Sequence, residues 1–181
     1  MIYTTLNKIR EHKPCKKGWE KLLTHLGKTK ADNEPLPLLT ILDSNGLDDC
    51  LWALRTVPEH AGLWRKYAVW CARQVEHLMT DERSKRALDV AWRYAEGKAT
   101  NEELDAAAEE AWEAWAAREA WAAREAAWSA LSARAAGAAW AARAAREAAD
   151  AAALAVGAAS EAADAAQETK LRTILSAGEW V

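Results

Sequence analysis

Residues 106–166 constrain the fold most narrowly, because 34 of these 61 residues are alanine. Within them, residues 110–128 read EAWEAWAAREAWAAREAAW, a near-repeat of Trp, Arg and Glu on alanine. Alanine has the highest helix propensity, so the segment predicts helix. One helix over 102–168 would be about 100 Å long, whereas a compact domain of this size has a radius of gyration of about 16 Å. The tail therefore either projects or folds back. The expected turn sites are Gly137 and Gly157, with Ser160 as a cap at which a helix restarts.

The tryptophans of this tail favour burial. On a helical wheel Trp112, Trp115 and Trp140 face roughly one way, and Trp121 and Trp128 face nearly the opposite way. A helix that is apolar on two sides is normally packed between neighbours. Alanine lets helix axes approach to the short end of the usual range of about 8–10 Å, and large rings can fill the remaining space. We interpret these indoles as core fillers. An exposed tryptophan ladder that binds a partner is the alternative, while membrane association is disfavoured because the tail is acidic.

The first half of the chain predicts a series of amphipathic helices. All four prolines lie at or before Pro58, and helix-forming residues dominate after it. Capping signals set the boundaries: glycine ends helices at Gly27 and Gly97, Asn45 and Thr80 are candidate N-caps, and TNEE at 100–103 is a capping box. The expected helices span 4–11, 16–26, 35–43, 47–56, 58–79 and 81–96.

These elements predict an all-α fold, an orthogonal array of eight or nine helices in which the alanine-rich helices pack tightly. Apolar stripes recur at helical spacing, as in Trp64, Ala68, Cys71 and Val75. We expect an amphipathic N-terminal part (1–99) and an Ala/Trp-rich part (100–181) packed together as one domain.

The charge distribution points to a candidate partner surface. Residues 1–30 contain eight Lys or Arg against two Glu, although the whole chain carries −3. A basic face of this kind can contact an acidic protein or phosphate. The alternatives are a solvated face, or a face that docks on the acidic run at 102–113 of the same chain. The candidate partner-binding residues are Lys13, Lys16, Lys17, Trp19 and Lys21.

A second group of polar residues suggests a structural cluster. Asp48 and Asp49 fall in the first turn of a predicted helix, where carboxylates interact favourably with the helix dipole. A buried pairing of either aspartate with Arg55 or Arg73 is one possibility. Acid–base chemistry at these aspartates is a weaker alternative.

Catalytic and metal-binding signals are absent from the sequence. The four histidines have no zinc-ligand spacing with one another or with a cysteine. The motif Gly27-Lys28-Thr29 lacks the earlier glycine of a phosphate-binding loop, because Leu22 stands there. The three cysteines are few and odd in number, which favours the reducing cytoplasm over a disulfide framework. We therefore expect that the protein is not an enzyme, that it binds no metal or cofactor, and that it does not span a membrane.

Two stretches carry a resemblance to a known family. They are GWEKLLTHLGKTKADNEPLPLLTILDSNGLDDCLWALR (18–55) and YAVWCARQVEHLMTDERSKRALDVAWRYAEGKATNEEL (67–104), followed by an Ala/Trp/Arg tail. This pattern resembles the Imm5-like immunity-protein family of phages and bacteria. The resemblance spans most of 15–168 and is specific in 18–104, whereas the tail matches only in composition. It implies an all-helical, cytoplasmic, non-enzymatic protein that binds a toxin.

The sequence thus supports two functional hypotheses. The first is a non-enzymatic inhibitor of immunity or antitoxin type that masks a protein partner in a bacterium or a phage-infected host. The alternative is a phage accessory protein that counters a host defence complex and contacts nucleic acid through the basic N-terminal face.

Overall fold

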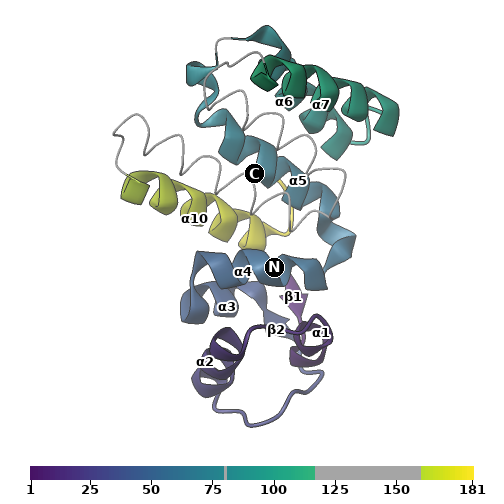
Figure 1. Cartoon of the computed structure of the whole chain (residues 1–181). Helices are drawn as coiled ribbons and strands as arrows, with labels where there is room; N and C mark the ends of the chain where they lie inside the picture. Colours follow the sequence, from purple (N-terminus) through teal and green to yellow (C-terminus); the bar gives the residue numbers. More distant parts are fainter. Residues whose placement is uncertain (80, 117–159) are drawn as a thin grey trace.

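The structure is a computed structural model that describes residues 1–79, 81–116 and 160–181 (Figure 1). Within these ranges the fold is all-α, as predicted, apart from one pair of two-residue strands. The helices stack in successive layers, with α1 and α2 at one end of the molecule and α6 and α7 at the other (Figure 1).

The chain begins with a short antiparallel strand pair that the sequence did not indicate. β1 (Tyr3–Thr4) pairs with β2 (Leu36–Pro37). The Leu38 N–H also donates to the Ile2 carbonyl at 3.1 Å. The predicted helices at 4–11 and 35–43 therefore began too early. They are α1 (Leu6–Glu11), capped by the Thr5 side chain, and α3 (Leu38–Asn45). The physical reason is pairing between two segments that are distant in sequence.

The next two boundaries follow glycine geometry. α2 (Lys16–Leu26) spans the predicted range and ends at Gly27, whose φ of 63° is left-handed. α4 (Leu47–Ala53) follows Gly46, whose φ of 94° also favours glycine. The prediction that Asn45 caps this helix is wrong, because Asn45 is the last residue of α3 and Gly46 is the cap.

Two longer helices form the middle of the molecule. The short 3-10 helices η1 (Leu54–Thr56) and η2 (Pro58–His60) lead into α5 (Ala61–Arg73), and η3 (Glu76–Leu78) follows it, so the single predicted helix 58–79 is broken at both ends. The predicted stripe of α5 is confirmed, since Trp64, Ala68, Cys71 and Val75 are all buried.

α6 (Glu82–Ala95) packs against α7 (Asn101–Ala116) through alanine surfaces. Asp81, not the predicted Thr80, caps α6, because the Asp81 carboxylate accepts from the Arg83 N–H. The capping box of α7 is confirmed: Glu103 N–H donates to Thr100 Oγ1 at 3.2 Å, and Thr100 N–H donates to Glu103 Oε2 at 2.8 Å. The buried alanines at this interface include Ala87 and Ala91 of α6 and Ala107, Ala108 and Ala111 of α7.

The C-terminal helix α10 (Ser160–Ala177) returns to the N-terminal half of the molecule. Leu171, Ile174 and Leu175 are fully buried in the same core as α3 and α5. The Ile2 N–H donates to the Leu175 carbonyl at 3.0 Å, so the first residues of the chain are fixed to the last helix.

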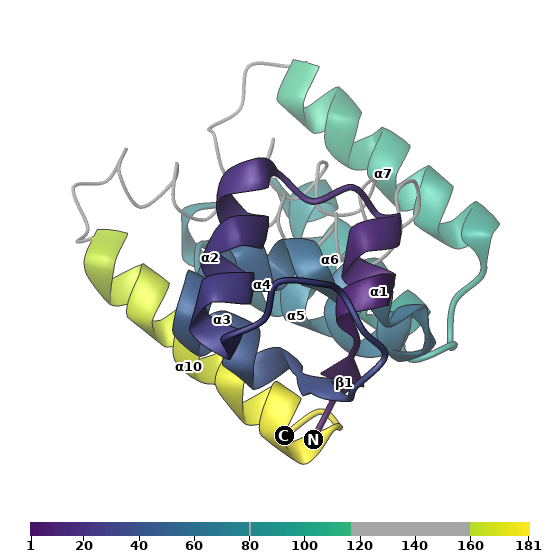
Figure 2. The same ribbon diagram turned by 90° about the horizontal axis from the view of Figure 1, so that it is seen from below.

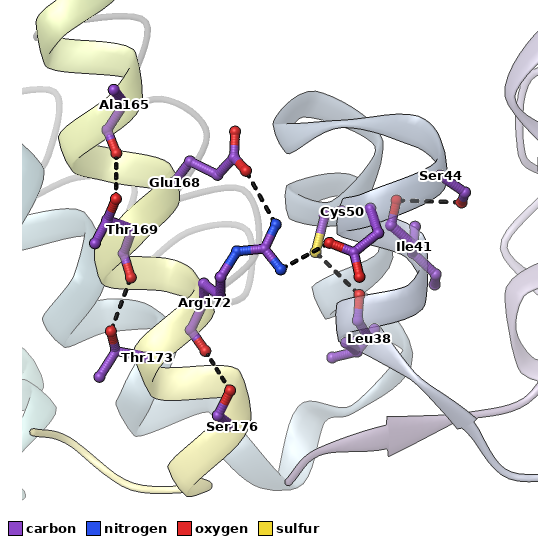
Figure 3. A network of polar contacts seen from close by, with 11 residues as sticks. Leu38, Ile41, Ser44, Cys50, Ala165, Glu168, Thr169, Arg172, Thr173 and Ser176 are labelled. Carbon is purple, nitrogen blue, oxygen red and sulfur yellow. Dashed lines mark hydrogen bonds and ion pairs between the residues drawn. The ribbon is translucent and has the colours of Figure 1, made fainter.

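Polar contacts also hold α10 against α3 and α5. Arg172 forms ion pairs with Asp43 of α3 at 2.7 Å and with Glu168 at 3.1 Å (Figure 3). The hydrogen bonds to these carboxylates raise the pKa of the Arg172 guanidinium. Tyr67 of α5 donates its hydroxyl to the Gln167 carbonyl at 3.1 Å. α10 is thus held to α3 and α5 by both apolar and charged groups.

Several predictions concern residues outside the described ranges. These are the turn sites Gly137 and Gly157 and the burial of Trp121, Trp128 and Trp140; the side chains of Trp112 and Trp115, in the last turns of α7, are not described either. None of the helices in the described ranges combines the length and apolar composition that a membrane crossing needs.

Candidate functional site

The N-terminus of α2 is built around a cysteine and a glycine. Cys15 is the N-cap, and its Sγ accepts from the Gly18 N–H at 3.3 Å. Pro14 precedes it, and the next two residues are exposed lysines. A proline before the cap and an acceptor at the cap explain why the helix starts here.

Gly18 allows α4 to approach α2 closely. A Cβ added at Gly18 would lie 2.7 Å from Asp49 Oδ2 and 3.3 Å from Cys15 Sγ, so a side chain would displace the carboxylate. Asn45 connects the same groups, because its Nδ2 donates to the Gly18 carbonyl at 2.9 Å and to Asp49 Oδ2 at 2.7 Å. The Ser44 hydroxyl donates to Asn45 Oδ1 at 2.8 Å and fixes the amide orientation.

Beside this polar junction lies a cavity of about 150 Å³, which we call the α2 groove. Its lining residues come mainly from α1, α2, α3 and α4, and Figure 2 shows how these helices are arranged. Trp19 and Trp52 are half-buried in its wall, and Asn45 and Asp49 form its polar side. The remaining lining residues are Ile9, Pro14, Cys15, Gly18, Leu22, Ile41 and Ala53.

Four exposed lysines follow or precede the groove residues along the chain, and we call them the lysine rim: Lys13, Lys16, Lys17 and Lys21. Lys21 Nζ donates to the Asn45 carbonyl at 3.4 Å, next to the polar side of the groove. Lys16 lies 3.8 Å from Glu20, and both side chains are well exposed, so this pair contributes little. Lys13 and Lys17 have no ion pair with any residue in the described ranges.

Lys13 also has an unusual backbone conformation. Its φ of 54° makes it the one residue other than glycine with a positive φ in the described part of the chain. This conformation costs roughly 1–2 kcal/mol for a residue with a Cβ. Strain of this size tends to be kept where a side chain has a function.

Of the five predicted partner-binding residues, Lys21 contacts the polar side of the α2 groove through the Asn45 carbonyl. Trp19 lines the α2 groove, and the four lysines flank it in sequence. The alternative in which this basic face docks on the acidic run at 102–113 is not what the described residues show. Glu103 pairs with Arg93 at 3.2 Å and Glu110 with Arg86 at 3.0 Å, so arginines of α6 neutralise those carboxylates.

Three members of the predicted polar cluster, Asp48, Asp49 and Arg55, lie in α4 and the adjoining η1, whereas Arg73 lies in α5. Asp49 bonds Asn45 at the α2 groove. Arg73, the last residue of α5, donates from Nη2 to Asp89 of α6 at 2.5 Å. Both residues come well after the aspartates of α4 in the chain. Arg55 donates from Nε to the Trp52 carbonyl at 2.8 Å and covers the Trp52 ring, with Cζ 4.5 Å from the ring centre. Asp48 is exposed in the first turn of α4, as the dipole interpretation expected.

Sequence reasoning missed three residues of the groove. Cys15 and Asn45 act through hydrogen bonds with Gly18 and Asp49, and Trp52 was not singled out. The usable signal was Gly18, a residue with poor helix propensity inside a run of helix formers. Such a glycine often marks a close approach of another element.

The groove does not present an evident catalytic or metal centre. No group of three or more histidine, cysteine or acidic residues with metal-binding geometry occurs among the described residues. Burial raises the pKa of the Cys50 thiol, and Cys71 is buried too, so neither faces solvent. Lys28, from the Gly27-Lys28-Thr29 motif, forms 2.6 Å ion pairs with Asp32 and Glu34. What the groove and rim offer is an apolar recess beside positive charge.

Comparison of the chain with protein-family models, with curated proteins and with solved structures gives no match.

Proposed function

We propose that this protein is a non-enzymatic binding protein that masks an acidic surface of a partner protein, in the manner of an immunity protein. The observation that carries the proposal is the lysine rim, where Lys13 and Lys17 find no carboxylate among the described residues. Elsewhere, at the α6–α7 interface, arginines are paired with acidic residues.

Apolar surface beside the charge favours a protein as the partner. Two half-buried indoles line the α2 groove next to the rim. Aromatic residues in a recess and cationic residues around it are typical of protein-binding surfaces. The resemblance of residues 18–104 to immunity proteins supports the same assignment, and we place the protein in the cytoplasm of a bacterium or of a phage-infected cell.

The test uses the full chain immobilised and exposed to extract from producing or infected cells. A protein partner should be captured, and raising the salt should weaken its binding only in part, because salt screens the lysine contacts but not the apolar ones. A Lys13→Glu, Lys17→Glu double variant should lose at least about tenfold of the captured protein, since like charges oppose binding across an interface. The matched control is a Lys85→Glu, Lys98→Glu variant, which changes the same charge far from the groove. Equal loss in both variants, or no loss in the first, would refute the proposal.

Nucleic acid is the second candidate partner, and the same lysines favour it. Captured nucleic acid would leave the column steeply between about 50 and 200 mM salt, because phosphate contacts release counterions. Nuclease treatment of the extract before capture separates the two: it removes all captured material if nucleic acid is the partner and leaves a protein partner in place.

A further inference from the structure

The α2 groove has the size of a single aromatic side chain. Its volume of about 150 Å³ matches that of engineered apolar cavities of about 150 Å³ that hold benzene. The lining is mainly apolar and includes Trp19, Leu22 and Ile41. A phenyl ring is therefore accommodated.

The polar side of the groove indicates how such a ring would be oriented. Asp49 Oδ2 already accepts from Asn45, but a carboxylate has acceptor capacity for several donors. The amide of a peptide that carries the ring supplies a donor of this kind. The carboxylate is fixed in place, because Asn45 holds it and Gly18 leaves room for it.

The charge beyond the groove indicates what flanks the ring. The rim holds four lysines within nine residues, and they outnumber the single acidic group of the groove wall. Flanking carboxylates would meet these lysines, whereas flanking lysines would be repelled by them.

We propose that the α2 groove is the anchor site for one phenylalanine-sized side chain in an acidic segment of a partner protein. This inference rests on the proposed function and adds to it the chemistry of the recognised segment. The ring fills the groove, a peptide N–H donates to Asp49, and neighbouring carboxylates lie against Lys13, Lys16 and Lys21.

Cys15 provides a direct readout of occupancy. It lines the groove and is exposed, whereas Cys50 and Cys71 are buried, so a thiol reagent acts on it selectively in the folded chain. A ligand seated in the groove covers its Sγ. The alkylation rate of Cys15 by iodoacetamide, followed by mass spectrometry, therefore measures whether the groove is filled.

The experiment compares three capped synthetic peptides on the wild-type chain: DEFED, DEAED and KKFKK. DEFED should slow the alkylation of Cys15 in a saturable way. DEAED should need at least about a tenfold higher concentration for the same protection, because it lacks the buried ring. KKFKK should also protect more weakly, because the rim repels it. A Cys15→Ser variant confirms that the modified residue is Cys15.

Each other outcome overturns the inference. Equal protection by DEFED and DEAED would mean that charge alone acts and the groove holds no ring. Stronger protection by KKFKK would mean that Asp49, not the lysine rim, sets the preference. Absence of protection by all three, up to their solubility limit, would remove the anchor site. In that last case the proposed function is still tested separately, by whether the Lys13→Glu, Lys17→Glu variant loses its captured partner.

Discussion

Lysine and tryptophan are used differently at the two sides of this molecule. Where α10 and the C-terminus meet α5 and α6, the ammonium of Lys170 lies 4.3 Å from the centre of the Trp180 ring, and Trp180 packs edge-on against Trp92 at 5.1 Å. Lys66 forms a 3.3 Å ion pair with Glu96. We call this region the C-terminal junction.

At the lysine rim, in contrast, Lys13 and Lys17 have no such partners among the described residues, and Trp19 and Trp52 border a groove. The difference teaches that composition alone does not separate a cation paired within the chain from an unpaired one. What separates them is whether an aromatic ring or a carboxylate of the same chain lies in contact with the charged group.

The largest expected effect lies in the apolar core beneath the C-terminal junction. Ile174→Ala removes a fully buried side chain, and we expect it to lower the free energy of unfolding by about 2–5 kcal/mol. Denaturant unfolding measures this. Thr173→Ala, on the exposed side of the same helix, is the control and should change the value by less than about 0.5 kcal/mol. Similar values for both would mean that α10 does not hold the N-terminal half together.

Trp180→Ala tests the aromatic contacts of the same junction. The variant loses an edge-to-face pair with Trp92 and a cation–π contact with Lys170, so we expect a loss of about 1–3 kcal/mol. Denaturant unfolding again gives the value, and Trp180→Phe should recover part of it. If Trp180→Ala left stability unchanged, the contrast between junction and rim would disappear.

The Lys13→Gly variant tests the lysine rim, the other half of the comparison. Because Lys13 has a positive φ, glycine should relieve strain and raise the free energy of unfolding by up to about 1 kcal/mol. The same variant should weaken partner capture. Lys17→Gly is the matched control: it also removes a rim lysine but lies inside α2, where glycine should lower stability by about 1 kcal/mol. A loss of stability in Lys13→Gly would contradict the strain argument.

The smallest effect concerns the capping box of α7. The Thr100 backbone N–H and, in addition, Arg93 hold the pKa of Glu103 below its usual range. Because the pKa of Glu103 is lower in the folded than in the unfolded chain, its carboxylate stabilises the fold at pH values above the unfolded pKa of about 4.3. This stabilisation is lost as the pH falls through the folded-state pKa. Glu103→Gln should therefore be less stable than the wild type at pH 7 and equally stable near pH 2. A constant difference across that range, in thermal unfolding, would argue against the cap.

Local signals predicted the parts of the fold that depend on neighbouring residues. α2 was predicted at 16–26 with Gly27 as its end, and the Thr100–Glu103 capping box was evident from four consecutive residues. The strand pair was not predictable in this way, because Thr4 and Leu36 meet across a long chain separation. Nor was the split of 58–79, where alanine and leucine favour helix but the chain turns through 3-10 segments.

The candidate site was predicted in its charges but not in its shape. Lys13, Lys16, Lys17 and Lys21 stand out in the sequence because acidic residues near them are few. The groove is assembled from four helices, and Asn45 reaches Gly18 across 27 positions. Hydrogen bonds at that separation leave no periodic trace, so only the structure reveals the recess beside the lysines.

The central claim is that the lysine rim serves a partner and not the fold. It is tested most directly by measuring unfolding free energy and partner capture side by side for a Lys13→Ala, Lys17→Ala double variant. We predict a change in unfolding free energy within about 1 kcal/mol, as for exposed positions, together with a loss of at least about tenfold in captured partner. A clearly destabilised variant, or one that captures its partner as the wild type does, would contradict the claim.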